Sequence, residues 1–265
     1  DDLLQRLGNL VKHRPLFIAH RGGRYRRLPE NSLEAMYRTA ECRWTLQEVD
    51  VQVTKDLHLI LMHDATLERT TNAMGKVQER ELKSLSHVHL KDQAGNITPF
   101  RIPLLTEALK WAKGKTILVL DLKPGVAFDP VLKEIRMTRS ENSVIVITYN
   151  LDDLKEYRRQ APELLYSANF SDPSSLSRIL EEQLQTSRLL GFVGVSKQNI
   201  DLWHAVRSLG VPVILATVGK FDVAAIKEGK EYYETLYQLG ADLLVTDEGF
   251  RSQCEDRGGV TGSVR

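Results

Sequence analysis

The chain has little of what would mark it as a membrane-spanning, disulfide-rich or nucleic-acid-binding protein. Its 265 residues include only two cysteines, Cys42 and Cys254, so a disulfide is left open but a framework of several bridges is excluded. No apolar run approaches the roughly 18 residues needed to cross a bilayer. The net charge of +1 gives no general attraction to nucleic acid or to membranes. We expect a soluble protein without a nucleic-acid partner and without stable membrane insertion.

The sequence also lacks a GxGxxG fingerprint, which disfavours a dinucleotide-binding open sheet. It begins at Asp1 without an apolar leader, and removal of a leader would leave the same start. The compartment therefore stays open between the cytoplasm and, if a leader was removed, the periplasm or the outside of the cell. The oligomeric state is open as well. A hydrophobic content of 42% and a length of 265 residues suit one α/β barrel or one large α/β domain.

Short apolar runs that are typical of buried strands alternate with helical patterns along most of the chain. The predicted strands are Leu16–Ala19, Leu46–Val53, Thr116–Asp121, Val144–Thr148, Leu164–Asn169, Phe192–Ser196, Val213–Thr217 and Leu243–Thr246. The predicted helices are Ser32–Cys42, Leu104–Ala112, Pro130–Met137, Leu151–Gln160, Pro173–Gln185, Asn199–Leu209, Val223–Lys227 and Tyr232–Leu239. Eight alternating strands predict a parallel sheet closed into a TIM (β/α)8 barrel, with an open doubly wound sheet as the alternative.

One segment interrupts this alternation. Leu59–Met62 is expected to pair with the second strand as a hairpin. Residues 65–103 fit poorly as a simple crossover and are interpreted as a small insertion over the mouth of the barrel. The prediction is therefore one barrel domain over residues 1–250, followed by a flexible polar tail over residues 251–265. Asn31 is interpreted as a cap of the helix that starts next to it.

Polar groups collect at the ends of two of the predicted strands. Phe17-Ile-Ala-His-Arg-Gly22 and Leu59-Ile-Leu-Met-His-Asp64 are apolar runs that lead into His20 and His63. Glu48 and Asp50 lie two apart on a strand, so both carboxylates face the same side. Two histidines and two carboxylates at strand ends can move protons and hold a hard divalent cation. A metal-assisted phosphodiesterase requires this combination of residues. The alternative is a pair of strand-capping histidines beside solvated carboxylates.

A series of ordered motifs carries a family resemblance. The motifs are His20-Arg-Gly22, Pro29-Glu-Asn-Ser32, Glu48-Val-Asp50, Val53-Thr-Lys-Asp56, His63-Asp64, Leu67-Glu-Arg-Thr-Thr71, Ile102-Pro-Leu-Leu-Thr-Glu-Ala-Leu109, Leu120-Asp-Leu-Lys123 and Gly240-Ala-Asp-Leu-Leu-Val-Thr-Asp247. Together they resemble the glycerophosphodiester phosphodiesterase family, from about Phe17 to Asp247. Any one of these motifs alone would be weak, whereas the ordered set is specific.

The resemblance implies a TIM barrel with an insertion after the second strand. It also implies hydrolysis of a small-molecule glycerophosphodiester to glycerol 3-phosphate and an alcohol, through a cyclic phosphate. One divalent metal ion is implied, Mg²⁺ or Ca²⁺ with Mn²⁺ as a further option. Carried over by motif, the acid–base pair is His20 and His63, the metal ligands are Glu48, Asp50 and Asp121, and the phosphate contacts are Arg21 and Lys123. Asp64 is expected to orient a neighbour, and Glu30 is a weaker site candidate.

Three departures from the family pattern concern the site. Asp121 stands where glutamate is common, and Ala216–Gly219 lacks an aromatic residue and an asparagine often found there. The loop after Gly22 carries Arg24, Arg26 and Arg27, which either read a second anionic group of the substrate or are simply solvated. Two other functions stay open: a phospholipase D-type or sugar phosphodiesterase, and a binding protein on a catalytically dead barrel.

Overall fold

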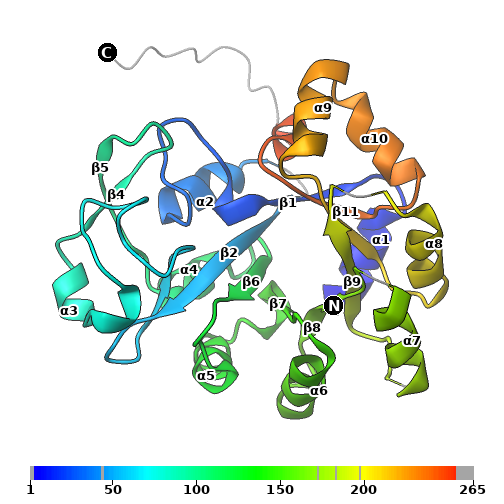
Figure 1. The fold of residues 1–265 in the computed structure, drawn as a ribbon, viewed down its shortest axis with the longest axis horizontal. Coiled ribbons are helices and arrows are strands. Elements are labelled where there is room, and N and C mark those ends of the chain that lie inside the picture. Colours follow the sequence, from blue (N-terminus) through cyan, green and yellow to red (C-terminus); the bar gives the residue numbers. More distant parts are fainter. Residues whose placement is uncertain (1–2, 43–44, 172, 183, 197, 255–265) are drawn as a thin grey trace.

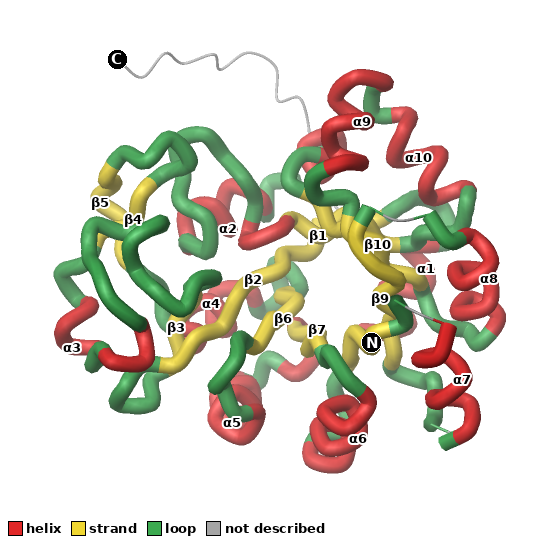
Figure 2. The backbone as a smooth tube through the Cα atoms, in the orientation of Figure 1, coloured by secondary structure: helices red, strands yellow, loops and turns green. Residues whose placement is uncertain are grey.

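A closed barrel of eight parallel strands lies at the centre of the structure (Figures 1 and 2). The computed structural model describes residues 3–42, 45–171, 173–182, 184–196 and 198–254. The barrel strands are β1 (Leu16–Ala19), β2 (Thr45–Val53), β6 (Leu118–Leu122), β7 (Val144–Ile147), β8 (Leu165–Asn169), β9 (Leu189–Val195), β10 (Val213–Ala216) and β11 (Leu243–Thr246). Neighbours follow the order β1-β11-β10-β9-β8-β7-β6-β2, and β1 pairs with β2 to close the ring. The predicted TIM barrel is confirmed.

Helices surround this ring of strands, as Figure 2 shows. They are α2 (Leu33–Thr39), α4 (Leu105–Ala112), α5 (Phe128–Thr138), α6 (Leu151–Gln160), α7 (Pro173–Glu181), α8 (Ile200–Ser208), α9 (Lys220–Glu228) and α10 (Glu231–Gln238). Their apolar faces share one core with the outward side chains of the strands, such as Phe17, Val49 and Leu120. Burial on both faces explains why the strands read as nearly continuous apolar runs.

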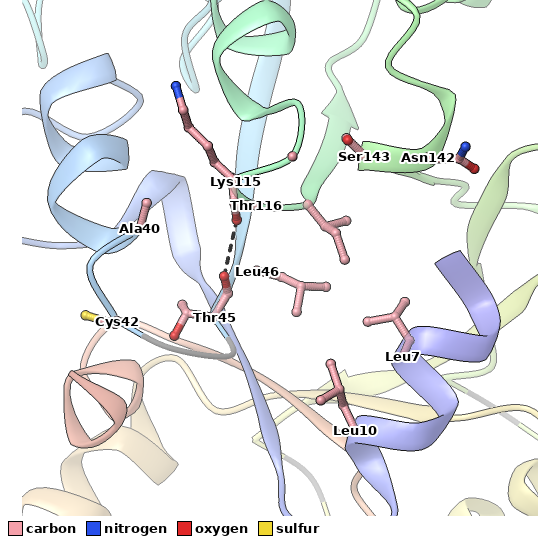
Figure 3. A pocket seen from close by; sticks show the side chains of 12 residues that line it. Leu7, Leu10, Ala40, Cys42, Thr45, Leu46, Lys115, Thr116, Asn142 and Ser143 are labelled. Carbon is pink, nitrogen blue, oxygen red and sulfur yellow. Dashed lines mark hydrogen bonds between the residues drawn. The ribbon is translucent and has the colours of Figure 1, made fainter. Parts of the chain in front are cut away.

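A helix that the sequence analysis did not predict closes the N-terminal end of the barrel. In α1 (Leu3–Val11), Leu3, Leu7 and Val11 recur every four residues and form one buried stripe. This stripe packs with inward side chains of the barrel such as Ile18 and Leu46. A cavity of 430 Å³ remains between α1 and the barrel, and none of its described lining residues is a histidine or a carboxylate (Figure 3).

The predicted hairpin and insertion follow β2. The strand β3 (Leu59–Leu61) pairs antiparallel with β2, as expected. The insertion carries α3 (Leu82–Leu85) and a two-stranded hairpin of β4 (His89–Lys91) and β5 (Ile97–Arg101). It has an apolar core of its own, which includes Leu67, Val77 and Leu90. The insertion is therefore a packed unit attached to the barrel beside β2, as Figure 1 shows.

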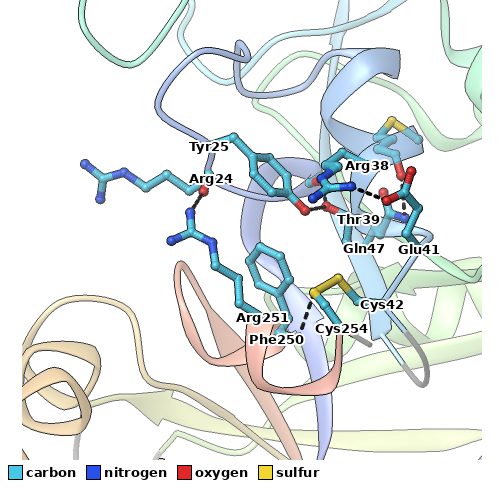
Figure 4. The surroundings of a disulfide bond; sticks show 12 residues. Arg24, Tyr25, Arg38, Thr39, Glu41, Cys42, Gln47, Phe250, Arg251 and Cys254 are labelled. Carbon is cyan, nitrogen blue, oxygen red and sulfur yellow. Dashed lines mark hydrogen bonds and ion pairs between the residues drawn. A yellow bond between two sulfur atoms is a disulfide. The ribbon is translucent and has the colours of Figure 1, made fainter. Parts of the chain in front are cut away.

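A disulfide ties the C-terminal segment to the turn between α2 and β2. Gly249–Gln253 forms a short 3₁₀ helix after β11, and Cys254 is bonded to Cys42 across 212 residues of sequence (Figure 4). Residues 251–254 of the expected flexible tail thus belong to this helix and this bond, while residues 255–265 lie outside the described residues. Within the described part of the chain, no helix has the length and apolarity needed to span a membrane.

Candidate active site

The inward face of the barrel changes from apolar to polar toward the C-terminal ends of its strands. The inward side chains nearer the N-terminal ends of the strands are apolar. They are Leu16, Ile18, Leu46, Val119, Ile145, Leu165, Leu190, Ile214 and Leu243. Since side chains two apart share a face of a strand, the next inward positions on β1, β2 and β6 are His20, Glu48 and Asp121. Asp50 follows Glu48 on β2 and stands opposite Asp121 in the parallel ladder. The pleat of three neighbouring strands therefore gathers these side chains.

The three predicted metal ligands form one buried acidic cluster. Carboxylate oxygens of Glu48, Asp50 and Asp121 lie within 4.8 Å of one another. Lys123 continues the inward face of β6, and its Nζ lies 2.6 Å from Asp50 Oδ1 and 2.6 Å from Asp121 Oδ2. A single ammonium group thus contacts two of the three carboxylates. Three carboxylates gathered in a buried place offer the oxygen ligands that suit a hard divalent cation.

The protonation of these groups reflects burial and the neighbouring charges. Burial raises the pKa of Glu48 well above its ordinary value, and Asp50 raises it further. Burial opposes ionisation of Asp50 as well, but Lys123 and a hydrogen bond from Asn31 outweigh it and lower the Asp50 pKa. For Lys123, burial alone would lower the pKa, whereas Asp50 and Asp121 raise it above its ordinary value. The lysine therefore stays charged.

Both histidines are held at Nδ1 by a carboxylate. His20 Nδ1 lies 2.9 Å from Asp247 Oδ1, and His63 Nδ1 lies 2.7 Å from Asp64 Oδ1. An ionised carboxylate only accepts hydrogen bonds, so Nδ1 carries the proton in each neutral ring and Nε2 keeps its lone pair. The side chains are 24% and 34% exposed, so substrate can reach them. Each ring is thus oriented with Nε2 available for proton transfer.

A sharp backbone turn after β1 positions His20 and Arg21. Arg21 has a φ of 54°, a left-handed conformation that is uncommon outside glycine. Gly23 follows with a φ of 109°, and a Cβ there would lie 2.2 Å from Thr39 Oγ1, so only glycine fits. The turn aims the Arg21 backbone N–H at Glu48 Oε2, at 2.7 Å. The backbone therefore connects the histidine strand to the acidic cluster.

A network of ion pairs at the mouth of the barrel connects Arg21, which follows His20, to Asp64, which binds His63. Arg69, from the insertion, donates to both oxygens of Asp64 at 2.6 and 2.9 Å and to Glu30 at 2.7 and 3.0 Å. Glu30 also accepts from Arg21 Nη1 at 2.9 Å. The hydrogen bonds from Arg69 hold the pKa of Asp64 far below its ordinary value. This network keeps Asp64 ionised behind His63.

Most of the predicted site residues line one central cavity of 310 Å³. They are His20, Glu48, Asp50, His63, Asp121 and Lys123. The opposite wall is formed by later strands and includes Tyr149, Asn169 and Phe192. Arg21 lines a neighbouring cavity instead, although its Nε approaches Asp50 Oδ2 to 3.8 Å. We call the 310 Å³ space the central cavity.

Sequence reasoning assigned no site role to three residues that contact this set. Asp247 binds His20, and the Tyr149 hydroxyl donates to Asp121 Oδ1 at 2.7 Å. Both continue the inward face of their strands by two residues, so the period of two could have revealed them. Asn31 is not a helix cap: Ser32 caps α2, while Asn31 binds Asp50 through both its side-chain atoms, at 2.6 and 3.0 Å.

Comparison with known proteins places this barrel in a class and then in a family. A closed α/β barrel with two histidines and an acidic cluster at the C-terminal ends of its strands has the architecture of a barrel-type enzyme. The model of the glycerophosphoryl diester phosphodiesterase family matches residues 20–248. The chain belongs to the glycerophosphoryl diester phosphodiesterase family, and the expectation of a phosphoric diester hydrolase is confirmed.

Individual relatives are similar to this protein over nearly the whole length of the chain. A glycerophosphodiester phosphodiesterase of Caldanaerobacter subterraneus is 28% identical over 244 residues, which are 88% of this chain and 94% of that protein. A glycerophosphoryl diester phosphodiesterase structure from Parabacteroides distasonis superimposes with a TM-score of 0.84 at 29% identity, covering 94% of this chain and 90% of that one. An Oleispira antarctica phosphodiesterase, solved with its product sn-glycerol-3-phosphate, shares the fold with a TM-score of 0.74 at 20% identity, over 91% and 96% of the two chains.

Proposed function

We propose that the chain hydrolyses glycerophosphodiesters to glycerol 3-phosphate and an alcohol, with His20 and His63 as the acid–base pair. One observation carries the proposal. Both histidines line the same cavity as the acidic cluster, and each has Nδ1 bound to a carboxylate so that Nε2 is available. Proton transfer by positioned histidines contributes about 10²–10⁴-fold to a rate. A pair of them serves both the attacking and the leaving oxygen.

Two histidines can carry out the proton transfers of the reaction in two steps. In the first, one neutral histidine takes the proton of the glycerol 2-hydroxyl as its oxygen bonds to phosphorus. The other histidine, protonated, gives its proton to the alcohol oxygen as that P–O bond breaks, which leaves a cyclic phosphate. In the second step the roles reverse: water loses a proton to the second histidine and bonds to phosphorus, while the first returns its proton to the 2-oxygen. Both histidines end as they began.

The acidic cluster fits the divalent metal that the family implies. Glu48, Asp50 and Asp121 offer only carboxylate oxygens, the donors that Mg²⁺, Ca²⁺ and Mn²⁺ prefer. Burial and the neighbouring Asp50 raise the pKa of Glu48, and a divalent cation bound by the three carboxylates would favour their ionised forms. A bound divalent ion would supply Lewis-acid neutralisation of the phosphoryl charge.

Arg21 and Lys123 are the proposed phosphate contacts. The Arg21 Nε is buried and has no hydrogen-bond partner among the described residues. A buried donor without an acceptor is costly, so a phosphoryl oxygen there would remove a penalty. Lys123 brings a permanent positive charge to the base of the cavity, where its ammonium contacts Asp50 and Asp121. Both side chains would offset the charge of the diester.

The disulfide supports an oxidising compartment. Cys42 and Cys254 are bonded, and such bonds persist outside the cytosol and are rare within it. The bond also bears on the phospholipase D-type alternative, for which a disulfide closing the first barrel loop would be expected. Here the bond joins the turn before β2 to the C-terminal segment. We propose that the protein works after export, on diesters of small alcohols.

The test is release of glycerol 3-phosphate from glycerophosphocholine and glycerophosphoethanolamine. Metal-stripped enzyme is compared with enzyme reloaded with Mg²⁺, Ca²⁺ or Mn²⁺. We expect metal-dependent turnover by the wild type and a loss of at least about 10³-fold in His20→Ala and in His63→Ala. His13→Ala, a change of an exposed histidine before β1, is the matched control and should keep full activity. Full activity of either site variant would refute the acid–base assignment.

A further inference from the structure

A second cavity lies beside the central cavity and shares His20 with it. Its volume is 250 Å³, and three guanidinium groups line it, from Arg21, Arg24 and Arg69. The carboxylates of Glu30 and Asp247 complete its charged lining. We call this space the arginine alcove. Because His20 lines both cavities, the alcove lies next to the place where a diester phosphorus would be held beside this histidine.

Among the three arginines of the alcove, Arg24 has the most exposed side chain with hydrogen-bonding groups left free by the described residues, since the unpartnered Nε of Arg21 is buried. All three guanidinium nitrogens of Arg69 already donate to Asp64 and Glu30. Arg24 donates only through Nη1, to Asp247 Oδ2 at 3.0 Å, and its side chain is 54% exposed. Its Nε and Nη2 make no hydrogen bond with the described residues. These two groups form one edge of the planar guanidinium, which matches the two oxygens of a carboxylate or a phosphate.

The backbone that carries Arg24 is held firmly. Its carbonyl oxygen accepts a hydrogen bond from Arg251, whose guanidinium lies 5.4 Å from the Tyr25 ring centroid and 5.8 Å from that of Phe250. The disulfide anchors this C-terminal segment at Cys254, just after the 3₁₀ helix that contains Phe250, and Figure 4 shows the Arg24 side chain extending away from the disulfide. A fixed backbone lowers the entropic cost of ordering a side chain on a ligand.

We propose that the arginine alcove selects glycerophosphodiesters whose alcohol carries a second anionic group, a carboxylate or a phosphate, and that Arg24 is the residue that determines this specificity. The inference rests on the proposed function, since it assigns the alcohol of that reaction to the alcove and the glycerol to the central cavity. Arg69 is paired with Asp64 and Glu30. An added anion would therefore be bound by the free edge of Arg24, which lies at the exposed side of the alcove.

The experiment measures kcat/KM for two pairs of substrates. Glycerophosphoserine and glycerophosphoethanolamine differ by one carboxylate. Glycerophosphoglycerol and its terminal phosphate ester differ by one phosphate, so the two pairs distinguish the anion sources. We expect the wild type to prefer the more anionic member of at least one pair by about tenfold, mainly through KM. Arg24→Gln should reduce that preference to within about twofold. Arg26→Gln changes an exposed arginine of the same loop that does not line the alcove, and should keep it.

The possible outcomes distinguish a failure of the proposed selectivity from a failure of the proposed phosphodiesterase activity. Turnover of all four substrates without a preference would overturn the selectivity while leaving the phosphodiesterase intact. An equal loss on both members of each pair in Arg24→Gln would show that Arg24 only positions His20 through Asp247, and would also overturn the proposal. If a folded, metal-loaded wild type turned over none of the four, the proposed function would fail as well.

Discussion

Asp247→Asn is expected to slow turnover strongly without disturbing the fold. In the wild type, Asp247 Oδ1 lies 2.9 Å from His20 Nδ1, and the Asp247 backbone N–H donates to Asp222 Oδ2 at 2.8 Å. Asparagine preserves the backbone contact and the side-chain size. It replaces one carboxylate oxygen by an N–H₂ group, which can turn toward Nδ1 and favour the tautomer with the proton on Nε2. His20 would then lack its lone pair at the reacting nitrogen.

The magnitude follows from the role of such orienting carboxylates. Mutation of a carboxylate that orients a metal-bound histidine typically costs 10–100-fold, about 1.4–2.7 kcal/mol, and we apply the same factor to the carboxylate that orients His20. We expect kcat on glycerophosphoethanolamine to fall by that factor at neutral pH and saturating metal. Asp152→Asn changes an exposed aspartate in the first turn of α6 and is the control. Asp247→Asn with a kcat within about twofold of the wild type, and with unchanged thermal unfolding, would refute the reasoning.

Three further results are expected. Arg69 lowers the Asp64 pKa below its ordinary 3.8, so the stability that ionised Asp64 contributes is present above about pH 4 and is lost on acidification. Urea unfolding of wild type and Asp64→Asn should therefore converge between about pH 5 and pH 2, and a constant gap would contradict this. Reducing the Cys42–Cys254 bond removes a cross-link over 212 residues and should cost about 2–5 kcal/mol, seen as a lower Tm with reductant; an unchanged Tm would argue against it. At 100-fold over its Kd, Mg²⁺ or Ca²⁺ should stabilise the wild type by about 2.7 kcal/mol, and Asp121→Asn by much less at the same concentration. Equal thermal shifts in the two proteins would contradict the metal site.

Most of the barrel could be predicted because each strand is a short apolar run buried on both faces. The strand β9 begins at Leu189, three residues before the predicted start at Phe192. The start was predicted too late because Gly191 interrupts the apolar run in the sequence. The helix α1 was missed although Leu3, Leu7 and Val11 have helical spacing. The strands β4 and β5 were also missed, because they form an isolated, half-exposed hairpin with little apolar pattern.

The candidate site was predictable where the chemistry lies in local motifs. The pair Glu48 and Asp50 shows its shared face directly in the period of a strand. Contacts between distant residues could not be found this way. Asn31 binds Asp50 across 19 residues, and Asp247 binds His20 across 227 residues, so only the closed barrel brings them together. The role of Asn31 was misread because asparagine next to a helix start is usually a cap.

The most direct test of hydrolysis at phosphorus follows the oxygen of water. Glycerophosphoethanolamine is turned over once by metal-loaded enzyme in ¹⁸O-water, and both products are weighed by mass spectrometry. The account predicts one ¹⁸O atom in glycerol 3-phosphate and none in ethanolamine, because water bonds to phosphorus and the alcohol keeps its own oxygen. Label in ethanolamine, or formation of phosphoethanolamine and free glycerol, would contradict the proposed reaction.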